Sequence, residues 1–419
     1  MTTTLILIIC ATSILLMLVR PKKIAEIYWV GGGALLLLLL RLMPLRQAAR
    51  AVADGSDVYL FLLGMMILSE LARENGVFDW VASLSVRTAQ GSCTRLFALI
   101  YVVGIVVTVC LSNDATAVVL TPAVLAAVRK AKAQPLPFLF ACAMIANAAS
   151  FVLPISNPAN LVVFRTGMPS LGAWLAAFAV PSLLSIATTF AVLRFVFRKE
   201  LRCEIEQPQE AAVLTHGGRL VLWGLGVVVL VLLAASALKM DLGLPTCVAA
   251  LCVTAVASLA ERSNPLPLLR QISWQTLGLV AALFVLVNAV ESVGALRFAE
   301  SALHAATGHG VQIGAVVAAC VVAVANNVVN NLPLGLIAGS TLAATHTHGL
   351  VAHAVLIGVD LGPNLSITGS LATILWLLAL RREGVRVTGA QFLRVGVVVM
   401  PAALLASMVG ALAMQAMLH

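Results

Sequence analysis

Long apolar runs separated by short polar connections recur along the whole chain. These runs cover residues 5–19, 27–43, 58–72, 94–111, 137–168, 173–197, 220–238, 244–260, 275–293, 311–325, 351–380 and 391–417. Because a bilayer core takes about 20 helical residues, runs of this kind predict membrane-spanning helices. The most polar connection, residues 198–219, lies near the middle of the chain. The pattern predicts an all-α polytopic membrane protein with a polar linker between two halves.

The same features follow one another in both halves, which indicates an internal duplication. Each half has a span, then a glycine (Gly76 or Gly294), an amphipathic segment and an apolar run that ends in a polar cluster. The first cluster is Ser112-Asn113-Asp114, and the second runs from Asn326 to Asn331. Further on, a Pro/Asn motif interrupts another run in each half, at 156–160 and at 360–364.

Polar clusters inside apolar runs are costly in hydrocarbon unless they line a cavity within the protein. Two shapes satisfy this condition, namely a re-entrant hairpin and a helix broken in mid-membrane. We therefore predict two inverted repeats, about ten transmembrane helices, two hairpins and two broken helices. The predicted units are a first repeat at 1–197 with a hairpin at 94–128 and a broken helix at 137–168, a cytoplasmic linker at 198–219, and a second repeat at 220–419 with a hairpin at 311–345 and a broken helix at 351–380.

The distribution of basic residues supports ten spans with both termini outside. In this topology 20 of the 26 Lys and Arg residues lie in cytoplasmic segments, as positive-inside bias requires. Counting every apolar run as a full crossing gives twelve spans and repeats of equal orientation, and this alternative stays open.

Composition excludes most other classes of protein. Only 10% of the residues are charged, whereas a soluble protein has roughly 25%. The net charge of +9 comes from short clusters between apolar runs, with no basic face for nucleic acid. The eight cysteines form no CxxC pair, and most lie in apolar runs, where cysteine behaves as a small hydrophobe.

Enzyme and cofactor signatures are missing from the sequence. The chain has no HExxH, GxSxG, P-loop or GxGxxG motif, so we predict no catalytic residues and no cofactor. His346 and His348 are a weak metal pair without a third ligand, so no metal site is predicted.

The polar residues at the predicted tips and breaks are the candidate substrate site. Free helix ends in the membrane core bind small polar solutes, and Asn, Ser and Thr add neutral donors and acceptors. The alternative is that these side chains only connect helices. The candidates are Ser112, Asn113, Thr116, Ser156, Asn157, Asn160, Asn326, Asn327, Asn330, Asn331, Asn364, Ser366, Thr368 and Ser370.

Two acids, Asp114 and Asp360, lie deepest in the predicted site. A carboxylate at this depth pairs with a cation or exchanges a proton, so both are candidates for proton coupling. For Asp114 the alternative is a cap at a helix N-terminus. We interpret Glu70 and Glu291, near the ends of corresponding spans, as interfacial.

Four motifs resemble those of the arsenite/antimonite efflux permeases of the ArsB type, in the ion transporter superfamily. Leu111-Ser-Asn-Asp-Ala-Thr-Ala-Val-Val-Leu-Thr-Pro122 resembles their ANDGAALxLTP, and Asn326-Asn-Val-Val-Asn-Asn-Leu-Pro333 resembles NxMNNxP. The stretch from Gly358 to Trp376 is similar to GCDLGPxxxPxGSLATLLW, and Arg73–Trp80 is similar to xESGFFEW. The resemblance runs from about residue 58 to residue 400.

The resemblance implies an inner-membrane carrier that exports arsenite and antimonite by proton antiport. Some members of the family also dock a soluble arsenite-stimulated ATPase. Whether the chain forms a homodimer is left open by the sequence. Arsenite is a neutral hydroxide at pH 7, which suits amides and hydroxyls better than a ring of charges.

Thr368 replaces a Pro of the family pattern, and two further departures matter more. Asn147 replaces the Asp of IADTAS, and Ser156-Asn-Pro-Ala-Asn160 replaces SNLVN. The alternatives are a Na⁺- or H⁺-coupled carrier of another small inorganic or carboxylate anion and, third, a membrane sensor or enzyme.

Overall fold

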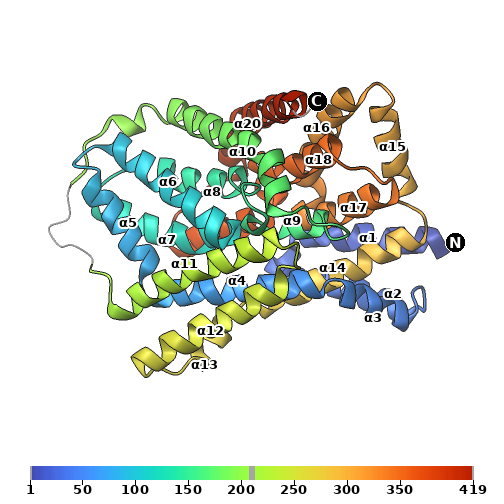
Figure 1. The fold of residues 1–419 in the computed structure, drawn as a ribbon, viewed down its shortest axis with the longest axis horizontal. Coiled ribbons are helices and arrows are strands. Elements are labelled where there is room, and N and C mark those ends of the chain that lie inside the picture. The colour runs from blue at the N-terminus through green and yellow to red at the C-terminus, as the bar shows by residue number, and fades with distance from the viewer. Residues whose placement is uncertain (1, 207–212, 418–419) are drawn as a thin grey trace.

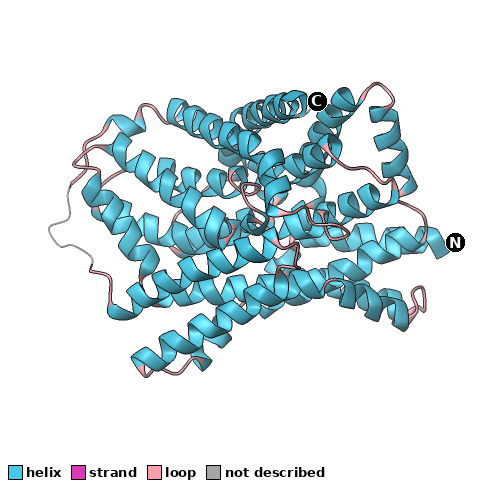
Figure 2. Ribbon diagram, viewed as in Figure 1, coloured by secondary structure: helices cyan, strands magenta, loops and turns pink. Residues whose placement is uncertain are grey.

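The computed structural model describes residues 2–206 and 213–417, which fold into helices joined by short loops (Figures 1 and 2). The first half contains α1 (Thr2–Val19), η1 (Pro21–Lys23), α2 (Glu26–Leu39), α3 (Leu45–Asp54), α4 (Ser56–Glu74), α5 (Val77–Thr88), α6 (Cys93–Leu111), η2 (Ala115–Leu120), α7 (Thr121–Lys130), α8 (Leu136–Ala148), η3 (Pro154–Ser156), α9 (Pro158–Val163), α10 (Leu171–Val196) and η4 (Glu200–Arg202). The second half contains α11 (His216–Ala237), α12 (Gly243–Glu261), α13 (Leu266–Gln271), α14 (Trp274–Ser292), α15 (Arg297–Thr307), α16 (Val311–Val329), α17 (Asn331–Ala344), α18 (Leu350–Leu361), η5 (Gly362–Asn364), η6 (Ile367–Gly369), α19 (Leu371–Arg382) and α20 (Gly389–Met417).

The long apolar helices are of membrane-spanning type. In the described part of the chain, eight are long and apolar enough to cross a membrane, namely α1, α6, α10, α11, α12, α14, α16 and α20. A ninth results if α3 and α4, which meet at a bend of 50°, count as one span. Their outer faces carry exposed side chains such as Trp223 and Leu259, each 80% accessible. Lipid covers such apolar faces, so the predicted all-α polytopic class is confirmed.

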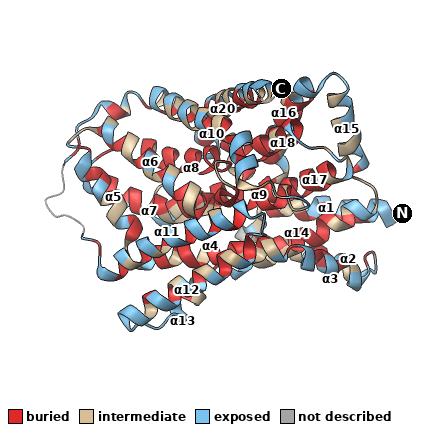
Figure 3. Cartoon of the chain, viewed as in Figure 1, coloured by how far each residue is buried: buried red, intermediate tan, exposed pale blue. Residues whose placement is uncertain are grey.

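Short helices occupy the centre of this bundle (Figure 3). All of α8 from Pro137 to Ala148 is buried, and so are nearly all residues of α18. The 13 residues of α8 are about 20 Å long, which is less than the roughly 30 Å of a bilayer core. The chain is therefore broken in the interior of the protein, and the broken helices that the sequence predicts are present.

Elements at corresponding places in the two halves lie at opposite ends of the molecule. Helix α5 follows the α4 span and lies at the left of Figure 1, whereas α15 follows the α14 span and lies at the right. Both chain ends lie on the right-hand side of the same view. Inverted repeats would have this arrangement.

Small residues bring α18 into close contact with α16. A Cβ atom added at Gly358 would lie 2.6 Å from the carbonyl oxygen of Ala319, and one at Gly362 would lie 2.5 Å from that of Ala323. Such contacts allow backbones to approach closely where no large side chain fits. The segment between these two glycines carries Asp360, so the packing fixes that acid in the core.

We expect Gly358→Ala to lower the apparent melting temperature in detergent, because overpacking a close contact costs about 1–3 kcal/mol. Gly226→Ala in α11 is the matched control, since nothing lies within 4 Å of its added Cβ atom. The melting temperature is measured by size-exclusion chromatography after heating. Equal melting temperatures for the two variants would contradict the close packing of α16 on α18.

Candidate functional site

Two helices end abruptly in the core at residues with an unusual backbone conformation. Ser112, directly after α6, has φ 119° and ψ 161°, and Asn330, directly after α16, has φ 80° and ψ 152°. Residues other than glycine rarely adopt positive φ, and such strain is concentrated at functional sites. An asparagine follows each break, Asn113 in the first half and Asn331 in the second. The chain then continues as the π-helical η2 and α7, or as α17.

The two broken helices are held together across the halves by buried side-chain hydrogen bonds. Asn157 caps α9 by accepting a hydrogen bond from the Ala159 N–H at 3.0 Å, and its Nδ2 donates to Asp360 Oδ1 at 2.8 Å. Asn147 Nδ2 donates to Asn364 Oδ1 at 2.9 Å. These contacts join the break after α8 to the break after α18, although about 200 residues separate each pair.

A small recess of about 10 Å³ lies where the breaks after α6, α8 and α16 meet. Asn113, Asp114, Asn157, Thr276 and Asn331 line it, together with apolar residues that include Leu62 and Pro158. We call it the central recess. The side-chain carbonyl oxygens of Asn113 and Asn331 are buried and have no hydrogen-bond partner in the protein. A buried acceptor without a partner costs about 1–3 kcal/mol, so these two oxygens are suited to a ligand that donates hydrogen bonds.

A larger cavity of about 130 Å³ adjoins this recess, and we call it the mouth cavity. It shares Leu62, Asp114, Pro158 and Thr276 with the central recess and extends to Glu70 and Gln271. Asp114 therefore lies where the two spaces meet. None of the described residues that line either space is Lys or Arg.

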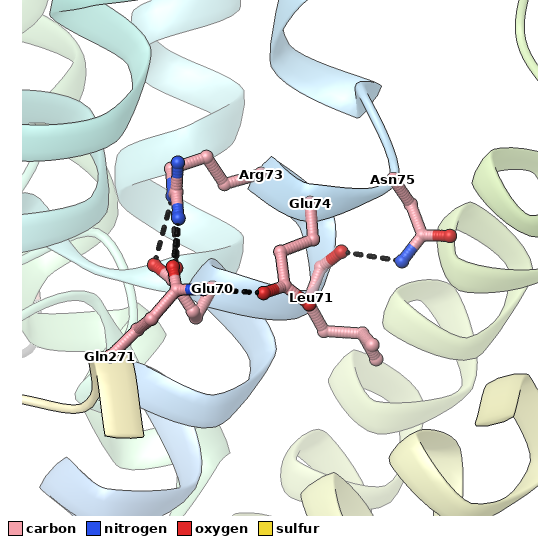
Figure 4. Close-up of polar contacts among 6 residues, drawn as sticks. All are labelled: Glu70, Leu71, Arg73, Glu74, Asn75 and Gln271. Atoms are coloured by element: carbon pink, nitrogen blue, oxygen red, sulfur yellow. Dashed lines mark hydrogen bonds and ion pairs between the residues drawn. The ribbon is translucent and has the colours of Figure 1, made fainter. Parts of the chain in front are cut away.

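A polar network borders the mouth cavity at the ends of α4 and α13 (Figure 4). Arg73 forms an ion pair with Glu70 and donates to the Gln271 side chain. Gln271 Nε2 in turn donates to Glu74 Oε1 at 2.8 Å. Glu70, which its place near the end of a span predicts to be interfacial, also lines the mouth cavity.

Other predicted site residues make hydrogen bonds that hold the breaks in shape. Asn160 donates to the carbonyls of Ser150, Leu153 and Pro154, and Asn326 donates to those of Gly358 and Val359. Thr116 pairs with Thr108 at 2.8 Å, and Ser156 donates to the Val109 carbonyl at 3.3 Å. The structure does not place these four candidates in the wall of either cavity.

The remaining candidates of the second half form a separate cluster around the break after α18. Ser366 Oγ donates to Asn327 Oδ1 at 2.6 Å, and Asn330 Nδ2 donates to the Thr368 carbonyl at 3.1 Å. Ser370 caps α19 by accepting from the Thr373 N–H at 3.1 Å. Asn364 pairs with Asn147 instead. In the first half, Ser112 lines the mouth cavity together with Asp114.

Several polar residues of the site are missing from the predicted set, among them Thr276 and Asn147. Thr276 lines both spaces and shares a hydroxyl hydrogen bond of 2.8 Å with Ser273, but a single threonine in an apolar run carries no signal. Asn147 stands out in the sequence only as a departure from the family pattern, and the structure shows it bonded to Asn364.

Helices broken around a polar recess in the membrane core define the class of secondary transporters, in which substrate binds at such breaks. The chain belongs to the citrate transporter (CitMHS) family, whose model matches residues 3–362.

Curated relatives and a solved structure agree with this class. The arsenical pump membrane protein of Escherichia coli strain K12 is 28% identical over 356 residues, which cover 80% of this chain and 81% of the relative. The putative arsenical pump membrane protein of Bacillus subtilis strain 168 is 23% identical over 368 residues, covering 81% and 83%. The Alcanivorax borkumensis YdaH transporter shares the fold, with a TM-score of 0.57, 14% identity and 86% of each chain covered. The resemblance to arsenite permeases seen in the motifs is thus confirmed by similarity along most of the chain.

Proposed function

We propose that this transporter exports trivalent arsenite and antimonite as neutral hydroxides, by proton antiport across the cytoplasmic membrane. The observation that carries the proposal is the chemistry of the central recess. Asn113 and Asn331 line this recess beside the 130 Å³ mouth cavity, and their side-chain carbonyl oxygens are buried without a partner in the protein, so they can accept hydrogen bonds. The three hydroxyls of As(OH)₃ or Sb(OH)₃ supply the matching donors without adding charge.

The same wall argues against citrate or another multiply charged anion. A tricarboxylate brings only acceptors and negative charge, so it needs Arg, Lys or many free N–H groups around it. The described lining instead has no Lys or Arg, and its charged members are the acids Glu70 and Asp114. An anion there would be repelled, whereas a neutral triol is not.

Asp114 and Asp360 are the proposed proton carriers. Asp114 borders the central recess, where a bound As(OH)₃ or Sb(OH)₃ molecule and a proton compete for the same acceptor atoms. Asp360 is fully buried, and only its Oδ1 is bonded, to Asn157, so its Oδ2 is free to hold a proton. Asn157 also lines the recess, so a single hydrogen bond links Asp360 to the substrate site.

The mouth cavity is the proposed route of entry from the cytoplasm. Positive-inside bias assigns its border around Arg73 and Gln271 to the cytoplasmic side. The inverted repeats predicted from the sequence supply the second state, since the halves exchange roles when access alternates. The opposite positions of α5 and α15 and the matching backbone at Ser112 and Asn330 support this view.

Competition in everted membrane vesicles tests the substrate class. The chain is expressed in a bacterial host that lacks its own arsenite exporters, and uptake of radioactive arsenite is recorded. We expect excess antimonite to suppress uptake and excess citrate to leave it unchanged. Suppression by citrate, or citrate accumulation of its own, would contradict the assignment.

A further inference from the structure

The polar linker is attached to both ends of the predicted first hairpin, at the start of α6 and just after α7. Thr94 Oγ1 at the start of α6 donates to the Leu201 carbonyl at 2.9 Å, and a bridge pairs Ser92 with Glu204. At the end of α7, Lys132 forms an ion pair with Glu206 at 2.7 Å. These contacts hold the linker against the base of the hairpin whose tip carries Asp114.

Two thiols meet at this attachment. Cys93 is the first residue of α6, and Cys203 follows η4. Both thiols donate to one atom, the carbonyl oxygen of Glu200, at 3.9 Å for Cys93 and 3.3 Å for Cys203. Cys203 is exposed, whereas Cys93 is buried. Because the two cysteines are far apart in the sequence, no CxxC spacing reveals the pair.

We propose that Cys93 and Cys203 form a dithiol site for trivalent arsenicals, separate from the central recess. This inference rests on the proposed function, because the site acts only if arsenite is the substrate that reaches the protein from the cytoplasm. Sulfur is the soft ligand that binds soft metal and metalloid centres. The two sulfurs lie within 3.9 Å and 3.3 Å of the same carbonyl oxygen, so they are neighbours that a rotation of the exposed Cys203 side chain can bring onto one arsenic atom.

The binding step is a condensation without any change of oxidation state. Two thiols and As(OH)₃ give (RS)₂AsOH and two water molecules: two As–S bonds form, two As–O bonds break, and each thiol proton leaves in a water molecule. One As–OH group remains on the arsenic. The bridge ties the linker to α6, which runs directly to the tip at Ser112, and it forms on the side that positive-inside bias assigns to the cytoplasm.

Intact-protein mass spectrometry in detergent tests the site with phenylarsine oxide as the probe. Condensation with both thiols adds one phenylarsenic bridge with loss of one water molecule. We expect the wild-type adduct to survive excess glutathione and to be removed by 2,3-dimercaptopropanol. Cys203→Ser and Cys93→Ser should each lose the stable adduct, while Cys252→Ser, which removes another exposed cysteine, should keep it.

Peptide mapping and transport separate this inference from the proposed function. Because Cys203 is exposed, its replacement leaves the fold intact even if Cys93→Ser fails to fold. A stable adduct at Cys93 and Cys203 in a protein that does not move arsenite would keep the dithiol site and overturn the proposed substrate. Arsenite transport with no glutathione-resistant adduct, or with an adduct that persists in Cys203→Ser, would overturn the dithiol site alone.

Discussion

Replacing Asp114 with asparagine is expected to abolish accumulation of arsenite driven by a pH gradient in everted vesicles. Asparagine keeps the size and shape of the side chain but binds no exchangeable proton. The variant should therefore let arsenite equilibrate downhill, while proton-driven accumulation falls below about a tenth of the wild-type value, because a deep carboxylate in a transporter commonly carries the coupled proton.

Asp79→Asn is the control for this experiment, since Asp79 is an exposed carboxylate on α5 that lines neither cavity. It should accumulate arsenite like the wild type. Full proton-driven accumulation in Asp114→Asn would remove Asp114 from the coupling role and leave Asp360 as the carrier. Loss of downhill exchange as well would instead assign Asp114 to substrate binding.

Asn157→Asp is expected to have a comparably large effect through a different interaction. The new side chain can still cap α9, because its oxygen accepts from the Ala159 N–H as Asn157 does. It cannot donate to Asp360, however, and two carboxylates then face each other in a buried site. Two buried like charges are strongly unfavourable, so arsenite exchange at neutral pH should fall by about tenfold or more.

The pH profile of exchange identifies this cause. One proton shared by the two carboxylates restores a hydrogen bond, so exchange by Asn157→Asp should recover in part as the pH is lowered. Asn264→Asp is the matched control, because Asn264 Oδ1 accepts from the Leu266 N–H at 2.9 Å in an exposed loop. A loss of exchange in Asn157→Asp that is the same at every pH would contradict the contact with Asp360.

The fold class and the place of the chain breaks could be predicted from the sequence. Apolar runs and low charge identify membrane helices, because the bilayer core excludes water from the backbone. The clusters at Ser112-Asn113-Asp114 and at Asn326–Asn331 coincide with the ends of α6 and α16, since a polar group in such a run is retained only where the structure accommodates it. The hairpins, the ten crossings and the inverted orientation remain predictions.

The sequence could not show which polar residues line the cavities and which ones hold the chain breaks in shape. Asn113 and Asn160 are both asparagines in polar clusters that interrupt apolar runs. Asn113 lines the central recess, however, whereas Asn160 donates to three carbonyls of its own loop. Which way an amide points depends on contacts between segments far apart in the chain. Thr276 and the paired thiols of Cys93 and Cys203 were missed for the same reason, because only folding brings them to their partners.

The most direct test of arsenite export by proton antiport is the uptake of radioactive arsenite into everted vesicles with an acid interior. We predict accumulation above the external concentration that needs no ATP, that collapses when a protonophore is added, and that is absent from vesicles without the protein. Accumulation that is unaffected by the protonophore, or none at any pH gradient in vesicles that contain the folded protein, would contradict the account.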